Sequence, residues 1–450
     1  MIKKLTFVLC VLSFAANAQV QKTAPWTKQI EATGKKTTDV TLEEISKSAE
    51  AYFATIDRNK KGSGIKPFER WKYHWSFYTD ESGKIKPAKH LWDAWKAKNE
   101  RNATNRLADE SNWQSLGPSS HTNTASWSSG QGRVNTAIID PNNPNIYYVG
   151  APAGGIWKST DAGASWTVLT DNLPQIGVSG IAIDPSDSNT IYIATGDDDA
   201  NDSYSVGVWK STDAGTTWNE AGNLSATSMN EIYIDPTNTQ TLLIATSTGV
   251  YKTIDGGANW NQTQSGNIID LKMKPGDSST WYAATSNTVF KSSDGGDNFS
   301  AVSITDLTGS GRLVLDVTPA NPNYLYVLSS KSTGSREFNG LFRSTNSGVT
   351  FTKMAETDNI LESSQAWFDL ALGVSDTDEN TVFVGCLNVW KTTNGGDNFT
   401  KVNNWNAPTS AAYTHGDIHF IRYNQGKLLV GSDGGFYQST DNGTTFTDLT

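Results

Sequence analysis

One short pattern occurs seven times between residues 159 and 446, and it constrains the fold more than any other feature of the sequence. The pattern is Ser or Thr, any residue, Asp or Asn, any residue, Gly, any two residues, and then Trp or Phe. Its third position falls, in steps of 39 to 52 residues, at Asp161, Asp213, Asp255, Asp294, Asn346, Asn394 and Asp441. Repeats of this length are typical of propellers and solenoids, which are arrays of similar units.

Each copy of the pattern predicts a tight turn between two strands. Asp and Asn side chains accept hydrogen bonds from nearby backbone N–H groups, and they tolerate left-handed backbone conformations. The glycine supplies a positive φ without steric cost, and the aromatic residue begins the next strand with a large buried surface. Two copies carry Asn at the third position, so the turn does not need the charge. We therefore interpret these seven residues as structural and not as catalytic.

Four short strands are predicted in each repeat. In the first repeat they are residues 133–141, 146–150, 155–159 and 166–169, where apolar residues are bounded by Gly, Pro, Asn and Asp. Such strands indicate an all-β protein, and four of them in each 40–50-residue repeat indicate propeller blades. We expect a β-propeller with about seven four-stranded blades over residues 113–450.

The number of blades stays open at this point. Residues 113–118, Trp-Gln-Ser-Leu-Gly-Pro, resemble the fourth strand of a blade but have no blade before them. The seventh repeat already has its own fourth strand, residues 446–449. We expect the natural protein to continue past Thr450 into at least one more blade. If the ring has seven blades, residues 113–116 pack elsewhere.

The seven segments resemble Asp-boxes, also called BNR repeats. This motif occurs in sialidases, in xyloglucan-cleaving endoglucanases, in the sortilin (VPS10) propeller and in propellers similar to photosystem assembly factors. Residues 148–161 and 207–213 most resemble secreted bacterial sortilin-like proteins. The resemblance implies a propeller, but it does not specify an activity, because one fold hosts many functions.

The first 18 residues have the pattern of an export signal. Lys3 and Lys4 precede an apolar run, residues 5–15, that is too short to span a bilayer, and residues 16–18 are Ala-Asn-Ala. We therefore expect a secreted or cell-surface protein without a transmembrane segment. Removal of this signal leaves Cys386 as the remaining cysteine, which excludes an internal disulfide framework.

Residues 19–112 differ in kind from the repeats. Residues 41–56, with Thr41 as a helix cap, and residues 86–102 are predicted helices. The intervening residues 62–75 combine aromatic and basic side chains, which suits stacking on carbohydrate or nucleic acid, or docking of this region on the propeller. We expect a helical, basic domain or linker that precedes the propeller.

The charge is unevenly distributed along the chain. Residues 19–112 carry 18 basic and 13 acidic side chains, whereas residues 113–450 carry 16 basic and 33 acidic ones. An acidic main body argues against nucleic acid as a partner. It suits a soluble protein that binds a cation or a neutral ligand.

An enzymatic function requires carboxylates or arginines at defined positions. In xyloglucanase-like enzymes an Asp precedes the Gly-Gly that opens the third strand of the first blade, and here Pro152 occupies the matching position. Sialidases need three arginines, for which Arg133, Arg312 and Arg422 are candidates, but the sequence lacks their Arg-Ile-Pro segment. For a glycosidase, which needs two carboxylates, the fallback residues are Glu231, Asp270, Asp369 and Asp417.

Two segments are candidate metal sites. His415, Asp417 and His419 would share one face of an extended strand, and this set could bind a divalent metal or line a polar channel. A second segment is rich in oxygen ligands that suit Ca²⁺, although a solvated acidic loop would look the same: Asp197, Asp198, Asp199, Asn201 and Asp202. No cofactor is required by any other motif.

Two functions remain open from the sequence. The first is a secreted, non-catalytic propeller that binds an extracellular protein, peptide or glycan, because seven structural turns occur without a matching catalytic pair. The second is an extracellular glycoside hydrolase that cleaves a polysaccharide, as the Asp-box resemblance and the Trp-rich loops suggest. The sequence leaves the question of catalysis undecided.

Overall fold

The computed structural model describes residues 24–35, 39–60, 62–86, 90–105, 117, 120–124, 128, 130–174, 176–197, 199, 203–334 and 336–450. The chain divides into two compact units, Met1–Ala108 and Asp109–Thr450, close to the predicted boundary at residue 112. The predicted signal, residues 1–18, and residues 113–118 apart from Gly117 lie outside the described residues. No helix among the described residues is long and apolar enough to cross a membrane.

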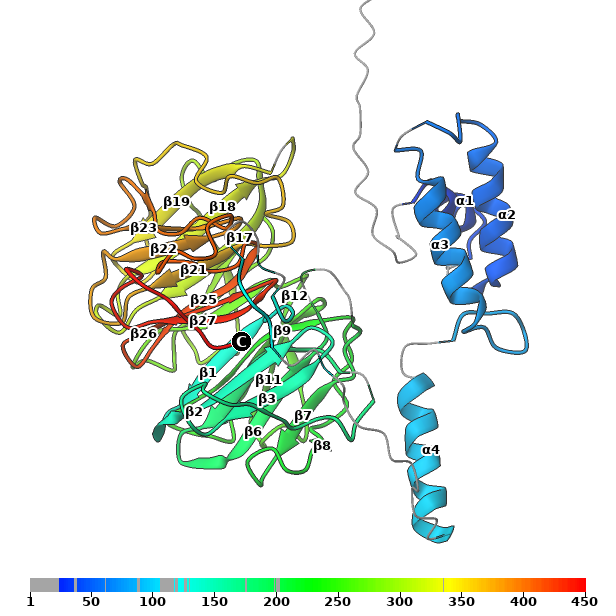
Figure 1. The fold of residues 1–450 in the computed structure, drawn as a ribbon, viewed down its shortest axis with the longest axis horizontal. Coiled ribbons are helices and arrows are strands. Elements are labelled where there is room, and N and C mark those ends of the chain that lie inside the picture. Colours follow the sequence, from blue (N-terminus) through cyan, green and yellow to red (C-terminus); the bar gives the residue numbers. More distant parts are fainter. Residues whose placement is uncertain are drawn as a thin grey trace, which may run out of the picture. The chain divides into compact units, whose positions relative to one another are not determined.

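The described part of the first unit contains four helices (Figure 1): α1 (Pro25–Glu31), α2 (Leu42–Phe53), α3 (Ile65–Ser76) and α4 (His90–Asn105). Thr41 caps α2 as predicted: its hydroxyl accepts a hydrogen bond from Glu44 N, and the Glu44 carboxylate accepts one from Thr41 N. The sequence predicted α2 and α4 but missed α3, which forms within the aromatic and basic segment. One face of α3 buries Phe68 and Trp71 against α2.

The second unit is a seven-bladed β-propeller. Its described residues form seven four-stranded antiparallel sheets, and in each sheet the neighbouring strands follow chain order (Figure 1). The strands of blades 1 to 3 are β1 (Thr136–Asp140), β2 (Asn143–Ala151), β3 (Gly155–Ser159), β4 (Thr167–Val168), β5 (Val178–Asp184), β6 (Asp187–Thr195), β7 (Val208–Ser211), β8 (Asn219–Glu220), β9 (Met229–Ile234), β10 (Leu242–Thr246), β11 (Gly249–Thr253) and β12 (Asn261–Ser265).

Blades 4 to 7 continue the same order along the chain. Their strands are β13 (Asp270–Met273), β14 (Trp281–Ala284), β15 (Val289–Ser292), β16 (Ser300–Val302), β17 (Ser310–Val317), β18 (Leu325–Lys331), β19 (Phe338–Ser344), β20 (Thr352–Lys353), β21 (Ala371–Val374), β22 (Val382–Gly385), β23 (Val389–Thr392), β24 (Thr400–Lys401), β25 (Ile418–Asn424), β26 (Lys427–Ser432), β27 (Gly435–Ser439) and β28 (Thr447–Asp448). The predicted fold class, with its four strands in each blade, is therefore confirmed.

Blade 7 packs against blade 1 and closes the ring. Val134 N donates a hydrogen bond to Ser432 O at 3.1 Å, and the Trp166 indole donates one to Leu449 O at 2.7 Å. A shared core, which includes Ile139 from blade 1 and Phe436 from blade 7, fills the space between the two sheets. Seven blades thus form a closed ring in which every blade is built from its own four consecutive strands.

The repeated turn has the geometry that its residues predict. In blade 1, Asp161 accepts hydrogen bonds from Ser165 N at 2.8 Å and from the Ser159 hydroxyl at 2.7 Å. Gly163 adopts φ +93° and donates its N–H to the Ser159 hydroxyl. Hydrogen bonds from Ser165 and Ser159 lower the pKa of Asp161 to about 2. The carboxylate is thus committed to the turn itself.

Asn supports the same turn where it replaces Asp. Asn346 Oδ1 accepts hydrogen bonds from Thr350 N and from the Ser344 hydroxyl, both at 2.9 Å. In blade 6, Asn394 Oδ1 likewise accepts a hydrogen bond from the Thr392 hydroxyl at 2.7 Å. The acceptor oxygen, and not the negative charge, is what these turns share.

Lysines of third strands join neighbouring blades through these turns. Lys291 of blade 4 donates to Ser347 O in the turn of blade 5 at 2.7 Å. In the same way, Lys391 of blade 6 donates to Asn442 O in the turn of blade 7 at 2.8 Å. Ser347 and Asn442 both have positive φ values, so their carbonyl oxygens are turned toward the preceding blade. The repeated turn therefore contributes to blade-to-blade packing as well as to each hairpin.

Candidate functional site

The first strands of the blades surround a polar channel along the axis of the propeller. A cavity of about 80 Å³ lies in this channel. Its lining includes, from six different blades, Asn135, Ser179, Glu231, Asp270, Arg312 and His419. Because each blade supplies side chains from its first strand, residues far apart in the sequence meet here.

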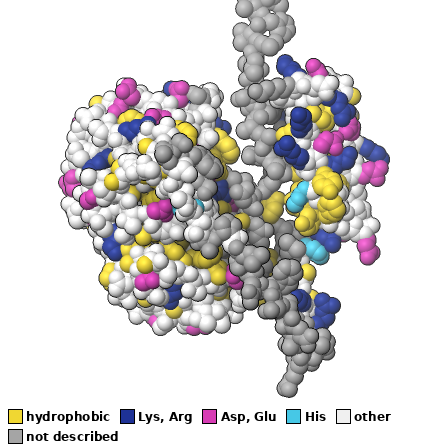
Figure 2. All heavy atoms as spheres, in the orientation of Figure 1, with side chains coloured by type: hydrophobic (Ala, Val, Ile, Leu, Met, Phe, Trp, Pro, Cys, Tyr) yellow, Lys and Arg dark blue, Asp and Glu magenta, His cyan; other side chains and the backbone are white. Residues whose placement is uncertain are grey.

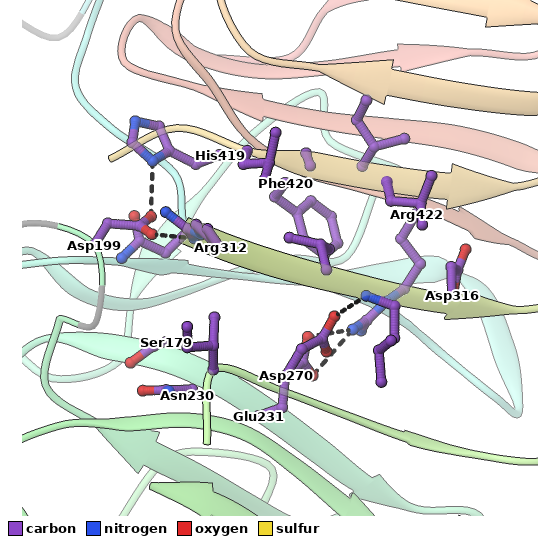
Figure 3. Close-up of a pocket in the computed structure, with 18 of the residues that line it drawn as sticks. Ser179, Asp199, Asn230, Glu231, Asp270, Arg312, Asp316, His419, Phe420 and Arg422 are labelled. Carbon is purple, nitrogen blue, oxygen red and sulfur yellow. Dashed lines mark hydrogen bonds and ion pairs between the residues drawn. The ribbon is translucent and has the colours of Figure 1, made fainter. Parts of the chain in front are cut away.

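At one end of the channel lies a set of eight charged or titratable residues that we call the histidine cluster: Arg133, Asp197, Asp199, Arg312, Asp369, Asp417, His419 and Asp433. Its centre is Asp199, which accepts a hydrogen bond from Arg312 at 2.7 Å through Oδ1 (Figure 3). The second oxygen of Asp199 lies 2.7 Å from Nδ1 of His419, and Nε2 of His419 lies 3.0 Å from Asp433. The cluster thus connects blades 2, 5 and 7.

The hydrogen bonds of the histidine cluster determine its charge states. Burial opposes a charge on His419, but its contacts with Asp199 and Asp433 raise its pKa to about 9. Burial also opposes ionisation of Asp199, yet Arg312 and His419 hold its pKa below the ordinary value. At neutral pH the imidazolium of His419 therefore lies between two carboxylates.

Two other carboxyl groups of the cluster have the opposite shift. Burial and the nearby Asp417 raise the pKa of Asp369 to about 8. Burial and the nearby Asp433 raise the pKa of Asp417. Gln365 donates a hydrogen bond to Asp417 at 2.9 Å, and the Cys386 thiol lies 3.5 Å from Asp369 Oδ1. These two groups are therefore harder to ionise than Asp199.

A second group, the lysine cluster, lies further along the channel and consists of Glu231, Asp270, Lys272, Asp316 and Arg422. Lys272 donates to Asp270 at 2.5 Å and to Glu231 at 3.4 Å. Arg422 donates to both oxygens of Glu231 at 3.2 Å. Burial lowers the pKa of Lys272, but Asp270 and Glu231 outweigh it and raise the value well above normal. Burial raises the pKa of Asp316 to about 7.

The expected strand of His415, Asp417 and His419 does not form. β25 begins at Ile418, and Asp417 has φ +58°, so the alternation that would place the three side chains on one face is broken. His415 contacts the carbonyl oxygen of Gly416 instead, with its Nδ1 at 3.0 Å. The three side chains therefore do not share one face of a regular strand, although both histidines lie close enough to Asp417 to offset part of the rise that burial causes in its pKa. Among the described residues, no group of three or more His, Cys, Asp and Glu side chains is placed to hold a metal ion.

The predicted calcium loop is divided by the structure. Asp199 lines the channel and binds Arg312 and His419, whereas Asp197 is buried and binds Arg133 at 2.7 Å. The other three candidates, Asp198, Asn201 and Asp202, lie outside the described residues. The two described carboxylates thus bind cationic side chains of the protein.

The fallback carboxylates and the candidate arginines also separate into pairs. Glu231 and Asp270 belong to the lysine cluster, whereas Asp369 and Asp417 belong to the histidine cluster. The three arginines suggested for a sialidase-type site each bind a separate carboxylate: Arg133 binds Asp197, Arg312 binds Asp199, and Arg422 binds Glu231. A bound acidic ligand would have to compete with these internal pairs.

Sequence reasoning missed Lys272, Asp316 and Asp433. Lys272 could have been found, because it lies two residues after Asp270 on the same strand and shares its face. Asp316 could have been found in the same way, because it lies four residues after Arg312 on β17 and shares its face. Asp433 has no comparable signal, since it lies in the hairpin between β26 and β27. Their importance follows from the ring that brings them to the channel.

Comparison with known proteins supports the propeller fold. No protein-family model matches the chain. A xyloglucanase of Paenibacillus sp is 29% identical over 127 residues, which are 25% of this chain and 12% of that protein. This similarity is local, and the matched part is a small fraction of the curated relative.

Solved GH74 structures have the same type of propeller. The Niastella koreensis GH74 enzyme matches with a TM-score of 0.52 and 21% identity, over 70% of this chain and 53% of that one. The GH74 xyloglucanase from Xanthomonas campestris matches with a TM-score of 0.54 and 15% identity, over 72% of this chain and 54% of that one. The matches cover about half of each of these solved chains. At these identities the likeness shows the fold alone.

Proposed function

We propose that this chain is an exported propeller that binds a protein, peptide or glycan outside the cell and does not catalyse a reaction. The observation that carries this proposal is the internal pairing of the channel. Arg133, Arg312, His419, Lys272 and Arg422 each bind a carboxylate of the protein. Such pairs stabilise the blades against one another, and they leave the cations engaged instead of poised for a substrate.

A second observation supports a non-catalytic role. Pro152 occupies the position at which the xyloglucanase-like pattern has a carboxylate, and a proline ring can neither accept nor donate a proton during hydrolysis. The backbone carbonyl of Pro152 accepts a hydrogen bond from the Ser203 hydroxyl of blade 2. The residue therefore has a packing role at a position where that family would need a reactive group.

We propose that the partner binds to the long loops that lead into blades 6 and 7. Residues 354–370 and 402–417 are the long connections into blades 6 and 7, and long ordered loops commonly carry function. The second of these loops carries Trp405, which is 41% exposed. An exposed indole next to polar groups is well suited to contact a peptide or a sugar.

Export supports an extracellular partner. The charged, apolar and small-residue regions of residues 1–18 follow the order of a secretory signal. The resemblance of the repeats to secreted bacterial sortilin-like proteins agrees with this reading. We expect the full chain to be secreted and mass spectrometry to show that its first 18 residues have been removed. Retention of the intact N-terminus would contradict this expectation.

The test of the function uses the full mature chain. Xyloglucan, other β-glucans and xylan are incubated with the protein, and new reducing ends are measured beside affinity electrophoresis on the same polysaccharides. We expect no release of reducing ends from any polysaccharide. If the partner is a glycan, the protein should be retarded on the gel that contains it; if the partner is a protein or peptide, the protein should bind that partner and run unretarded on every polysaccharide gel. Sustained release of oligosaccharides that disappears in a single carboxylate variant would overturn the proposal.

A glycoside hydrolase is the second candidate, because the local similarity to xyloglucanases accompanies a carboxyl group suited to proton donation. Asp369, with its pKa of about 8, would be protonated at neutral pH as a general acid must be, but because it is fully buried the surrounding loops would have to open before it could reach a substrate. Under this alternative, Asp369→Asn would abolish turnover of xyloglucan. The same variant would leave affinity-gel retardation unchanged if the chain only binds the polysaccharide.

A further inference from the structure

The histidine cluster has more carboxylates than cations. It contains Asp197, Asp199, Asp369, Asp417 and Asp433 against Arg133, Arg312 and His419, so full ionisation would leave an excess of two negative charges. Asp197 and Asp199 bind the two arginines, and Asp433 shares His419 with Asp199. Among the described residues, no ion pair joins Asp369 or Asp417 to a cation. The two carboxyl groups without a compensating cation are therefore Asp369 and Asp417.

Asp369 receives little relief from hydrogen bonds of the described residues. It is fully buried, at 0% exposure; the weakly donating Cys386 thiol lies 3.5 Å from its Oδ1, and its Oδ2 has no hydrogen-bond partner there. An ionised carboxylate with one unpaired oxygen in such a place is costly. The raised pKa of Asp369, caused by burial and then by Asp417, is the expected response.

The cluster is accessible through its other members. The Asp433 side chain is 33% exposed, and Asp417 is half-buried. Trp405, 41% exposed, lies beside this site: a Cβ at Gly416 would come within 3.2 Å of Trp405 Cβ. Asn388 fixes the backbone of Trp405 through a hydrogen bond of 2.9 Å. The rim thus combines two accessible carboxylates with an anchored, exposed indole.

We propose that Asp417, Asp433 and Trp405 bind an organic cation, namely a lysine or arginine side chain of a peptide partner, above the buried Asp369. This inference rests on the proposed binding function and names the chemistry of its partner. An ammonium or guanidinium group gains charge-assisted hydrogen bonds from the carboxylates and a cation–π contact from the indole. A metal ion would gain nothing from the indole, and the described carboxylates and histidines do not form a set of metal ligands.

The direct test measures the binding of short peptides to the full mature chain by fluorescence anisotropy. The probes are labelled pentalysine and pentaarginine, with pentaglutamate as the negative control, at 0.15 M salt. We expect both basic peptides to bind and pentaglutamate not to bind. Asp417→Asn and Asp433→Asn should each weaken binding about tenfold, since each removes one charge-assisted contact, and Trp405→Ala about fivefold.

A matched variant separates this site from the general acidity of the propeller. Asp306 is an exposed aspartate with φ +66°, between β16 and β17, and Asp306→Asn makes the same change of charge in the same backbone conformation as Asp417→Asn. Asparagine tolerates that conformation, so both variants should fold. We expect Asp306→Asn to bind the peptides within twofold of the wild type. Equal losses in the two variants would overturn the proposal.

The pH dependence gives a second readout. Loss of the Asp369 proton adds negative charge beneath the bound cation, so affinity should rise between pH 6 and pH 8.5. His419, His415, Asp199, Asp433, Asp417, Cys386, Arg133 and Arg312 also face this region. The pKa of His419 is about 9, so its charge persists over most of this range, and burial raises the pKa of the Cys386 thiol well above normal. His415 acts on Asp417, so His415→Gln is measured as well, and a profile that flattens in this variant and not in Asp369→Asn would overturn the proposal. Asp369→Asn should flatten the profile, and an unchanged profile in that variant would contradict the proposal.

The outcomes also distinguish this inference from the proposed function. If Asp417→Asn leaves the binding of a polysaccharide or protein unchanged, the organic-cation site is wrong but the proposed binding function is still supported. Polysaccharide turnover would overturn the binding function itself. The protein is also titrated with CaCl₂ or ZnCl₂. Tight metal binding that is lost in Asp417→Asn would overturn the proposal and show that the site binds a metal ion and not an organic cation.

Discussion

His419 lies 2.7 Å from Asp199, although the two residues are 220 positions apart in the sequence. The contact spans the channel from blade 7 to blade 2. Asp199 is also bound by Arg312 of blade 5, so three blades meet at one carboxylate. The relationship explains both the charge on the imidazole and the alignment of blades that are not neighbours in the ring.

The first prediction concerns the pH dependence of stability. The folded-state pKa of His419, about 9, exceeds its ordinary value of 6.5. Its stabilisation is therefore fully present below pH 6.5 and is lost as the pH rises through 9. His419→Gln should lower the free energy of unfolding by about 3 kcal/mol at pH 6, because it removes one partner of a buried pair, and by much less at pH 10.

Urea unfolding at pH 6 and at pH 10 checks this prediction. His415→Gln is the control, since His415 contacts a backbone carbonyl of its neighbour, and it should change stability by less than about 0.5 kcal/mol. An equal loss for His419→Gln at both pH values would show that the imidazolium charge contributes nothing.

The second prediction concerns Asp369. Its folded-state pKa of about 8 lies above the ordinary 3.8, so the folded state favours the protonated form. The stability associated with this group is fully present below pH 3.8 and is lost as the pH rises through 8. Asp369→Asn cannot ionise and should exceed the wild type by on the order of 2 kcal/mol at pH 9.

A comparison of thermal unfolding at pH 5 and pH 9 tests the role of Asp369. At pH 5 the advantage of Asp369→Asn should be smaller than at pH 9, because the unfolded-state carboxyl group ionises above pH 3.8 and the penalty grows from there until the pH reaches the folded-state pKa of about 8. A variant that is less stable than the wild type at pH 9 would mean that Asp369 is favourably ionised in the fold.

The third prediction concerns closure of the ring. The Trp166 indole of blade 1 donates a hydrogen bond to Leu449 O of blade 7. Trp166→Phe keeps an aromatic ring but removes this donor, and loss of the hydrogen bond should cost about 1 kcal/mol. Trp218 occupies the same position of the repeat in blade 2, and its buried indole nitrogen has no hydrogen-bond partner among the described residues.

Trp218→Phe is therefore a matched control with no hydrogen bond to lose. Both substitutions remove the same ring atoms and so share a packing cost, and Trp166→Phe should cost about 1 kcal/mol more than Trp218→Phe. Chemical unfolding of both variants measures the difference. If the two substitutions have equal effects, the indole hydrogen bond across the ring closure makes no measurable contribution.

The fourth prediction concerns the lysine cluster. Glu231 binds both Lys272 and Arg422 inside the channel. Glu231→Gln leaves these two buried cations with less negative charge, and it should lower the free energy of unfolding by about 3 kcal/mol. A double-mutant cycle with Arg422→Met should show coupling, because the second change removes a cation that the first has left uncompensated. Strict additivity would argue against a direct pair.

The sequence predicted the propeller because its signals are local. The turn at Asp161 depends on Ser159, Gly163 and Ser165, which all lie within four residues of it. One short sequence pattern therefore specifies all the contacts of the turn. The same pattern occurs in every blade, and repetition then implies a ring of similar sheets. Thr41 predicted the start of α2 for the same reason, since a capping box is complete within four residues.

The local signals failed where the backbone departed from regular structure. Alternation placed His415, Asp417 and His419 on one strand, but the positive φ of Asp417 ends that alternation just before β25. The helix α3 was missed because its aromatic and basic residues attracted a functional interpretation.

The amino-acid sequence by itself determined the repeated turns, the strands between them and the aromatic residue directly before each fourth strand, because hydrogen bonds and dihedral preferences act over a few residues. The tertiary structure alone decided which charges meet in the channel. Asp199 is adjacent to His419 and Arg312 only because seven blades close into a ring. The residues next to a loop carboxylate in the sequence cannot predict the partner that a distant blade supplies.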